Sequence, residues 1–177
     1  MNSRQKDLVT LRAMEPEDLD MLYRVENDRD LWFVGVTNVP YSRYILHNYI
    51  ATATGDIYTD KQVRLIVENG EGEAVGMADL TNFDPRHRRA ELSLVIEKPW
   101  RRHGYARAAV LEMHRYAQTV LHLHQLYVVI SEQNENTLTL FQSLGYTTAA
   151  HLEDWLYDGD KYTRAVLMQK ILLNKHN

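Results

Sequence analysis

Residues 100–107 read WRRHGYAR and gather three arginines, a histidine and a glycine between Pro99 and a segment with helical spacing. The first turn of a helix exposes about four unpaired backbone N–H groups, and the helix dipole adds roughly half a positive charge there. Gly104 lets a ligand approach the backbone closely, and Ala106 does nearly the same through its small size. The pattern therefore predicts an anion site, for which phosphate is the usual ligand. The alternative interpretation is a solvated basic turn that caps a surface helix.

Such a site needs a strand before the turn and a helix after it, and the hydrophobic spacing predicts both. Residues 90–97 alternate, with Leu92, Leu94 and Ile96 on one face. Residues 104–120 carry apolar side chains at intervals of three and four, which is typical of an amphipathic helix. A buried strand at 125–131 and a short helix at 134–144 follow, and Gly145 provides the stop signal of that helix.

The other predicted elements complete a sheet around this unit. Further strands are predicted at 8–13, 62–68, 74–83, 146–157 and 161–171, and helices at 15–26 and 41–54. The turn at 69–72 and the pair Asp158-Gly159 are hairpin signals, so most neighbouring strands should be antiparallel. The expected fold class is α/β (α+β), a mixed but mostly antiparallel sheet with helices packed on it.

Composition narrows the function classes. A length of 177 residues suits one domain, and the net charge of −4 gives no reason to expect nucleic-acid binding. The chain has no cysteine, which excludes disulfides and thiol nucleophiles. No signal peptide and no apolar run of membrane-spanning length is recognisable, so we expect a cytoplasmic protein without a membrane partner. No metal site is expected, because these histidines are too scattered: His87, His103, His114, His122 and His124.

Several spaced motifs resemble one enzyme family. Arg101-x-x-Gly104-x-Ala106 after a strand is similar to the acyl-CoA pyrophosphate loop of the GCN5-related N-acetyltransferases (GNAT), written Q/R-x-x-G-x-G/A. The segment His87–Glu91 enters the strand before the loop, Asn134 begins the next helix, and Leu144-Gly145-Tyr146 ends it as in that family. Within the superfamily, the pattern from Leu80 to Tyr146 most resembles the spermidine N-acetyltransferases and the ribosomal-protein N-terminal acetyltransferases.

The resemblance implies a fold and a cofactor site. It implies one N-acetyltransferase domain over residues 1–177, with about seven strands, about four flanking helices and a sheet splayed at the cofactor site. Acetyl-CoA, with no metal, would lie between the strands at 91–97 and 125–131. The residues implied to hold it are Ser93, Leu94 and Val95 through backbone groups, the loop residues Arg101, Arg102, His103, Gly104, Tyr105, Ala106 and Arg107, and Asn134. Asn134 could equally serve as a plain helix N-cap.

Two positions bear on the chemistry. An attacking amine must lose a proton, and Glu91 is the leading general base, although an ion pair with Arg88 or Arg89 would also explain it. Phe141 occupies the position of the family's general-acid tyrosine and cannot donate a proton. Protonation of the thiolate would then fall to water, Tyr146 or Tyr105, or be dispensable. A non-catalytic acyl-CoA-binding module is therefore retained as the alternative function.

The expected acceptor is a primary amine of a small molecule or of a peptide N-terminus. From Leu31 to Ala53 the chain has no Asp or Glu, although the spermidine enzymes carry an acidic cluster in this region, which disfavours a polyamine. The aromatic residues Trp32, Phe33 and Tyr41 are candidate substrate-binding residues, with core packing as the alternative. Glu26, Asp28 and Asp30 are the nearby carboxylates that could recognise one ammonium group. A homodimer or higher homo-oligomer is also expected from the resemblance.

Overall fold

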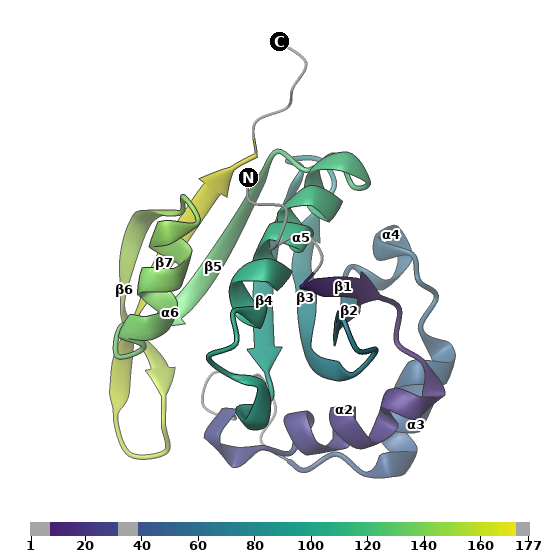
Figure 1. The fold of residues 1–177 in the computed structure, drawn as a ribbon. Coiled ribbons are helices and arrows are strands. Elements are labelled where there is room, and N and C mark those ends of the chain that lie inside the picture. Colours follow the sequence, from purple (N-terminus) through teal and green to yellow (C-terminus); the bar gives the residue numbers. More distant parts are fainter. Residues whose placement is uncertain (1–7, 32–38, 173–177) are drawn as a thin grey trace.

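The computed structural model describes residues 8–31 and 39–172 and contains a seven-stranded sheet (Figure 1). Its strands are β1 (Val9–Arg12), β2 (Val63–Asn69), β3 (Ala74–Asp84), β4 (Arg89–Ile96), β5 (Gln125–Ser131), β6 (Thr147–Tyr157) and β7 (Tyr162–Ile171). Their order across the sheet is β1-β2-β3-β4-β5-β7-β6. Only β4 and β5 run parallel; the other neighbours are antiparallel. The mixed, mostly antiparallel sheet predicted from the sequence is confirmed.

The described residues form five α-helices, one more than the sequence analysis expected. They are α2 (Leu19–Glu26), α3 (Arg43–Thr52), α4 (Ile57–Asp60), α5 (Tyr105–Thr119) and α6 (Glu135–Ser143), with 3₁₀ turns at Pro16–Asp18, Arg29–Leu31 and Lys98–Trp100. The additional helix, α4, is a single turn whose N-cap is Asp56. Four residues are too few to show a hydrophobic period, so no pattern in the sequence predicts this helix.

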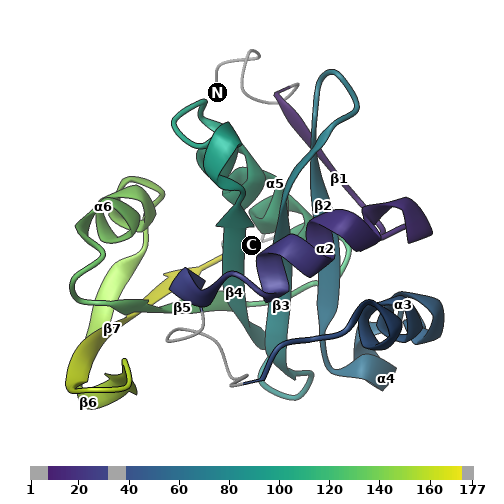
Figure 2. The same ribbon diagram turned by 90° about the horizontal axis from the view of Figure 1, so that it is seen from below.

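Helices cover both faces of the sheet (Figure 2). The alternation along the strands assigns each side chain to a face. On one face Val67 and Ala78 join the core that contains the apolar side of α5 and Phe141 of α6. On the other face the neighbouring residues Ile66 and Met77 pack against α2 and α3. The parallel pair β4–β5 therefore lies with α5 and α6 on one side, while α2 and α3 cover the opposite face over β2 and β3.

The parallel strands separate soon after they meet. β4 pairs with β5 only from Arg89↔Gln125 to Glu91↔Tyr127. Beyond these residues β4 remains paired with β3 up to Ile96, and β5 remains paired with β7 up to Ser131. The edges of β4 and β5 that face each other past Glu91 are thus open, as expected from the sequence.

Candidate active site

The turn between β4 and α5 presents backbone amides outward. Arg102 and Gly104 have φ values of 68° and 84°, a left-handed conformation that suits glycine and reverses the chain ahead of the helix. The first backbone hydrogen bond of α5 runs from Ala108 N to Gly104 O at 3.1 Å, and within the described residues no side chain caps the helix. The N–H groups of residues 104–107 are therefore left for a ligand.

A cavity of about 240 Å³ lies directly against this turn. Its lining includes most of the predicted loop residues together with the end of β4 and one residue of α6: Ile96, Trp100, Arg101, Arg102, Gly104, Tyr105, Ala106, Arg107 and Leu140. His103 is not part of this lining; it is exposed and stacks on the ring of Tyr105 with centroids 5.8 Å apart. An open cavity lined by the unpaired amides at the start of α5 and by arginine residues fits the pyrophosphate of an acyl carrier such as CoA.

Two of the three predicted arginines are already engaged. Arg101 Nε donates to Ile96 O at 3.0 Å, which ties the turn to the end of β4. Arg107 Nη1 donates to Ser143 Oγ at 2.8 Å, which links the first turn of α5 to the end of α6. These arginines brace the turn as well as adding positive charge, whereas Arg102 is exposed at the rim of the cavity.

The backbone of β4 has one edge committed to β3 and one edge facing the opening. Glu97 N donates to Val75 O at 3.0 Å. Hydrogen-bonded pairs alternate along antiparallel strands, so Val95 and Ser93 also direct their backbone groups toward β3. Leu94 then presents its N–H and C=O to the opening, which makes it the best placed of the three predicted backbone contacts.

Glu91 lies at the point where the opening begins, and its contacts differ from an ion pair. Asn82 Nδ2 donates to Glu91 Oε2 at 2.7 Å, and the Tyr127 hydroxyl on β5 also interacts with Glu91. The alternative partners are engaged elsewhere: Arg88 Nε donates to His122 O at 2.7 Å, and Arg89 pairs with Asp84 at 3.3 Å. Glu91 is thus a carboxylate held by neutral donors on the sheet face opposite α5.

Phe141, which the resemblance matches to the family's general-acid tyrosine, is a core residue. Phe141 is only 4% exposed and packs edge-on against Tyr146, with ring centroids 4.9 Å apart. Tyr146 is itself buried, its hydroxyl lies 3.0 Å from His114 Nε2, and burial raises the pKa of that hydroxyl. Tyr105 packs against Trp100 and His103 beside the turn. Tyr146 is therefore poorly suited to donate a proton, and Tyr105 lies at the phosphate end of the site.

Asn134 caps α6 in the structure. Its side-chain oxygen accepts a hydrogen bond from Thr137 N at 3.2 Å, and its backbone N–H donates to Ser131 O at the end of β5. This accounts for an asparagine at the start of a helix without any ligand. The side-chain amide nitrogen is not used by the cap, so a role toward the acyl carrier remains compatible with the capping role.

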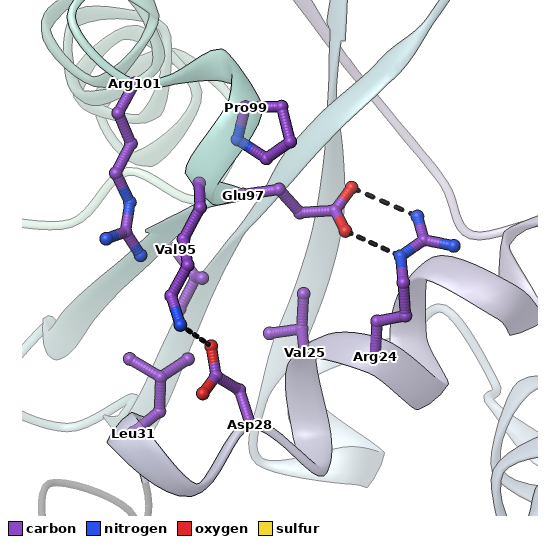
Figure 3. A pocket seen from close by; sticks show the side chains of 9 residues that line it. Arg24, Val25, Asp28, Leu31, Val95, Glu97, Pro99 and Arg101 are labelled. Atoms are coloured by element: carbon purple, nitrogen blue, oxygen red, sulfur yellow. Dashed lines mark hydrogen bonds and ion pairs between the residues drawn. The ribbon is translucent and has the colours of Figure 1, made fainter.

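A second cavity of about 230 Å³ lies on the α2 side of the end of β4 (Figure 3). Two ion pairs flank it: Arg24 with Glu97 at 2.9 Å, and Lys98 with Asp28 at 3.2 Å. Asp30 also pairs with Lys98, and Glu26 pairs with Arg64, so the carboxylates proposed for ammonium recognition already have cationic partners. Arg101 lines both this cavity and the cavity beside the turn, so Arg101 lies between the two cavities.

The aromatic acceptor site expected from the sequence is only partly described. Trp32 and Phe33 lie outside the described residues. Tyr41 packs, partly buried, against the core formed with α2 and α3, and Asn27 holds its backbone by accepting from Tyr41 N and donating to Tyr41 O. Its position is explained by core packing. Across residues 8–31 and 39–172 no group of three or more His, Asp or Glu is placed to hold a metal ion, and no helix there is long and apolar enough to span a membrane.

Two residues of this site, Asn82 and Tyr127, escaped the sequence analysis. Tyr127 lies within the apolar run of β5, where it looks like any aromatic strand residue. Asn82 lies in β3 and gives no motif of its own. Only the parallel register of β4 and β5 and the bulge in β3 bring both to Glu91. The sequence around Asn82 contains only two adjacent polar residues, Thr81 and Asn82, which are consistent with a bulge but do not specify one.

We call the opening between β4 and β5 past Glu91 the seam, and the unpaired amides of residues 104–107 the phosphate cradle. Together they define an acyl-CoA-dependent acyltransferase fold. Residues 9–147 match the family profile of the acetyltransferase (GNAT) domain. The chain therefore belongs to the GNAT acetyltransferase family. It is an N-acetyltransferase enzyme, and acetyl-CoA is its acyl donor.

The relatives include characterised enzymes and solved structures. Spermidine N(1)-acetyltransferase of Escherichia coli K12 is 29% identical over 168 residues, which is 90% of this chain and 84% of the relative. The enzyme of the same name from Vibrio cholerae serotype O1 is 25% identical over 99% of both chains. A crystal structure of spermidine N-acetyltransferase from Vibrio cholerae in complex with CoA and spermine superimposes with a TM-score of 0.82 at 25% identity, covering 93% of this chain and 96% of that one. A dodecameric structure of the Vibrio cholerae enzyme, with a TM-score of 0.80 at 23% identity over 96% and 99% of the chains, shares the fold.

Proposed function

We propose that this enzyme transfers the acetyl group of acetyl-CoA directly to a primary amine of a small molecule or of a peptide N-terminus, within a ternary complex. The observation that carries the proposal is the seam between β4 and β5. It has free amides at one end, around Gly104, and a carboxylate at the other end, at Glu91. A thioester held along this seam would have its acyl carbon near Glu91.

Each end of the seam contributes a different action. Acetyl-CoA supplies an activated acyl carbon joined to a thiolate leaving group. Amides of residues 104–107 hold the pyrophosphate, and Leu94 presents an N–H that can polarise the thioester carbonyl. Glu91 accepts the proton that the amine loses as its nitrogen bonds to the acyl carbon and the carbon–sulfur bond breaks. Water takes over the protonation of the thiolate, since Phe141 cannot donate and Tyr146 is buried.

The acceptor is the open part of this proposal. The names of the relatives support a polyamine. Against this, residues 31–53 lack Asp and Glu, and the described carboxylates near the α2 end of the site are ion-paired. We therefore propose the wider class of primary amines, with spermidine as the polyamine member to test. Residues 1–177 as one domain, self-association and a cytoplasmic location stay predictions.

The test is thiol release from acetyl-CoA with a panel of amines: spermidine, a peptide with a free N-terminus and an amino sugar. The matched negative control is the same peptide with its N-terminus acetylated. Release with at least one amine and none with the control supports the proposal. CoA binding in a calorimeter without turnover on any amine would instead favour the alternative, a non-catalytic acyl-CoA-binding module, for which Phe141 is the supporting observation.

Glu91→Gln tests the proposed base. Turnover should fall by about 10²-fold or more, while the dissociation constant of CoA stays within about twofold, because the carboxylate is distant from the phosphate cradle. Equal losses of turnover and CoA affinity would show that Glu91 supports the structure instead of the proton transfer.

A further inference from the structure

Three side chains from neighbouring strands meet where β4 and β5 separate. Glu91 and Tyr127 form the last paired position of the two parallel strands. Asn82 Nδ2 donates to Glu91 at 2.7 Å, and the Tyr127 hydroxyl interacts with both Glu91 and Asn82. The cluster lies at the mouth of the seam, on the sheet face that also carries the exposed Ser93. An incoming amine can therefore reach the Glu91 carboxylate on this face.

The backbone is distorted to bring Asn82 into this cluster. The pairing of β3 with β4 shifts between Thr81 and Asp84, which marks a bulge, and Asn82 has a φ of 49°. A left-handed non-glycine residue costs conformational energy, although asparagine tolerates it better than most. Asn82 is exposed, so packing does not hold it there. Its side chain donates a hydrogen bond to Glu91 and interacts with the Tyr127 hydroxyl, so the distorted backbone at the bulge places Asn82 in this cluster.

Tyr127 is suited to donate a hydrogen bond to Glu91. Burial, and then the negative charge of Glu91, raise the pKa of the Tyr127 hydroxyl, while Asn82 and the Arg89 guanidinium act in the opposite direction. The charged groups around it are Glu91 and Arg89 on β4 and Asp84 on β3, which pairs with Arg89; its register partner on β7 is the uncharged Gln169. The hydroxyl thus keeps its proton at neutral pH and offers it to the carboxylate.

We propose that Asn82 and Tyr127 are positioning residues for acetyl transfer, which fix the orientation of the Glu91 carboxylate at the mouth of the seam. The proposal rests on the function proposed above for Glu91. Both residues act through Glu91, by donating hydrogen bonds to one carboxylate from two different strands. A carboxylate held in this way meets the amine in one orientation.

The first experiment measures kcat and KM for the accepted amine and for acetyl-CoA in Tyr127→Phe. Loss of one hydrogen bond to a charged group should lower kcat/KM for the amine about tenfold near neutral pH, through kcat. KM for acetyl-CoA should stay unchanged. Tyr116→Phe is the matched control: Tyr116 lies on α5, is partly buried, and its hydroxyl has a pKa raised by burial alone. This control should retain the wild-type kcat and KM.

Asn82→Gly gives a second, independent variant. Glycine keeps the left-handed backbone at this position but removes the side-chain donor, so the bulge survives while the contact to Glu91 is lost. The same direction of change is expected as for Tyr127→Phe. If both variants keep the wild-type kcat and the wild-type KM for the amine, the positioning role is refuted, because the contacts to Glu91 would then be lost without any effect on acetyl transfer.

The second experiment does not depend on activity. In protein labelled with ¹³C at tyrosine Cζ, the Tyr127 signal is identified by its disappearance in Tyr127→Phe and titrated with pH. The pKa of Tyr127 should fall in Glu91→Gln, since the negative charge that raises it is removed. An unchanged Tyr127 pKa would overturn the inference even in an active enzyme. If the wild-type protein acetylates no amine but the pKa of Tyr127 still falls in Glu91→Gln, the proposed function is refuted and the contact between Glu91 and Tyr127 is established.

Discussion

Replacing Gly104 by aspartate, with asparagine as its uncharged counterpart, tests the phosphate cradle directly. A side chain at this position has space, since an added Cβ would meet only Leu8 Cδ2 at 3.5 Å. The φ of 84° is left-handed, and Asn and Asp tolerate that conformation better than other non-glycine residues. The two variants should therefore share a similar loss of stability, of about 1 kcal/mol, and differ mainly in charge.

The charge difference sets the expected loss of CoA affinity. A carboxylate on residue 104 would lie about 6 Å from a diphosphate held by the amides of residues 104–107, which carries roughly two negative charges. At an effective dielectric constant between about 40 and 80, suitable for a solvent-exposed cavity, the repulsion amounts to about 1–3 kcal/mol. The aspartate variant should thus bind CoA roughly 10- to 100-fold more weakly than the asparagine variant.

Isothermal titration calorimetry with CoA at low and high salt measures this difference. The gap between the two variants should narrow at high ionic strength, because salt screens the repulsion in an open cavity. Equal CoA affinity of the aspartate and asparagine variants at low salt would show that the diphosphate does not lie at this turn. Thermal unfolding of both variants without CoA provides the control, and it should show similar melting temperatures.

Two further outcomes follow from neighbouring elements. Asn134→Ser keeps an N-cap acceptor for Thr137 N, whereas Asn134→Ala removes it and should lower the free energy of unfolding by about 1 kcal/mol. A fall in CoA affinity in the serine variant, measured by calorimetry, would reveal a contact between the Asn134 amide and the acyl carrier. Burial, and then Lys170, lower the pKa of His114 to about 4. His114 takes up a proton near pH 6.5 in the unfolded chain but not in the native protein, so about 3 kcal/mol of unfolding free energy should be lost as pH falls from 6.5 to 4. Denaturant unfolding measures this loss. The His114→Gln variant should not show this part of the pH dependence.

The elements that bear the cradle could be predicted because their signals are local. The alternation in residues 90–97, the glycine at 104 and the spacing of the following helix all fall within one stretch of chain, and β4, the turn and α5 appear there. The single-turn helix α4 has no such signal, since the hydrogen bonds that Asp56 accepts from Tyr58 N and from Thr59 Oγ1 are a feature of many turns. Local patterns therefore predict elements that are long enough to show a period.

The part of the site that depends on register could not be predicted. Glu91 stands out in the sequence, yet its partners come from β3 and β5, and a shift of one residue in either pairing would turn them to the other face. Tyr127 lies beside Glu91 through the parallel register of β4 and β5, two strands that are separated in the chain by α5. From the sequence, Arg88 and Arg89 are the expected alternative partners of Glu91, because charge is visible in a sequence and register is not.

The two ends of the seam differ in what they require of the sequence. At the cradle the proposed binding groups are main-chain amides, so the demand on the sequence is the left-handed backbone at Arg102 and Gly104. At the mouth the proposed acting group is a side chain, Glu91, which accepts a hydrogen bond from Asn82 and interacts with Tyr127. Acceptor chemistry can therefore change through a few side chains on the α2 face while the acyl-carrier end is left untouched.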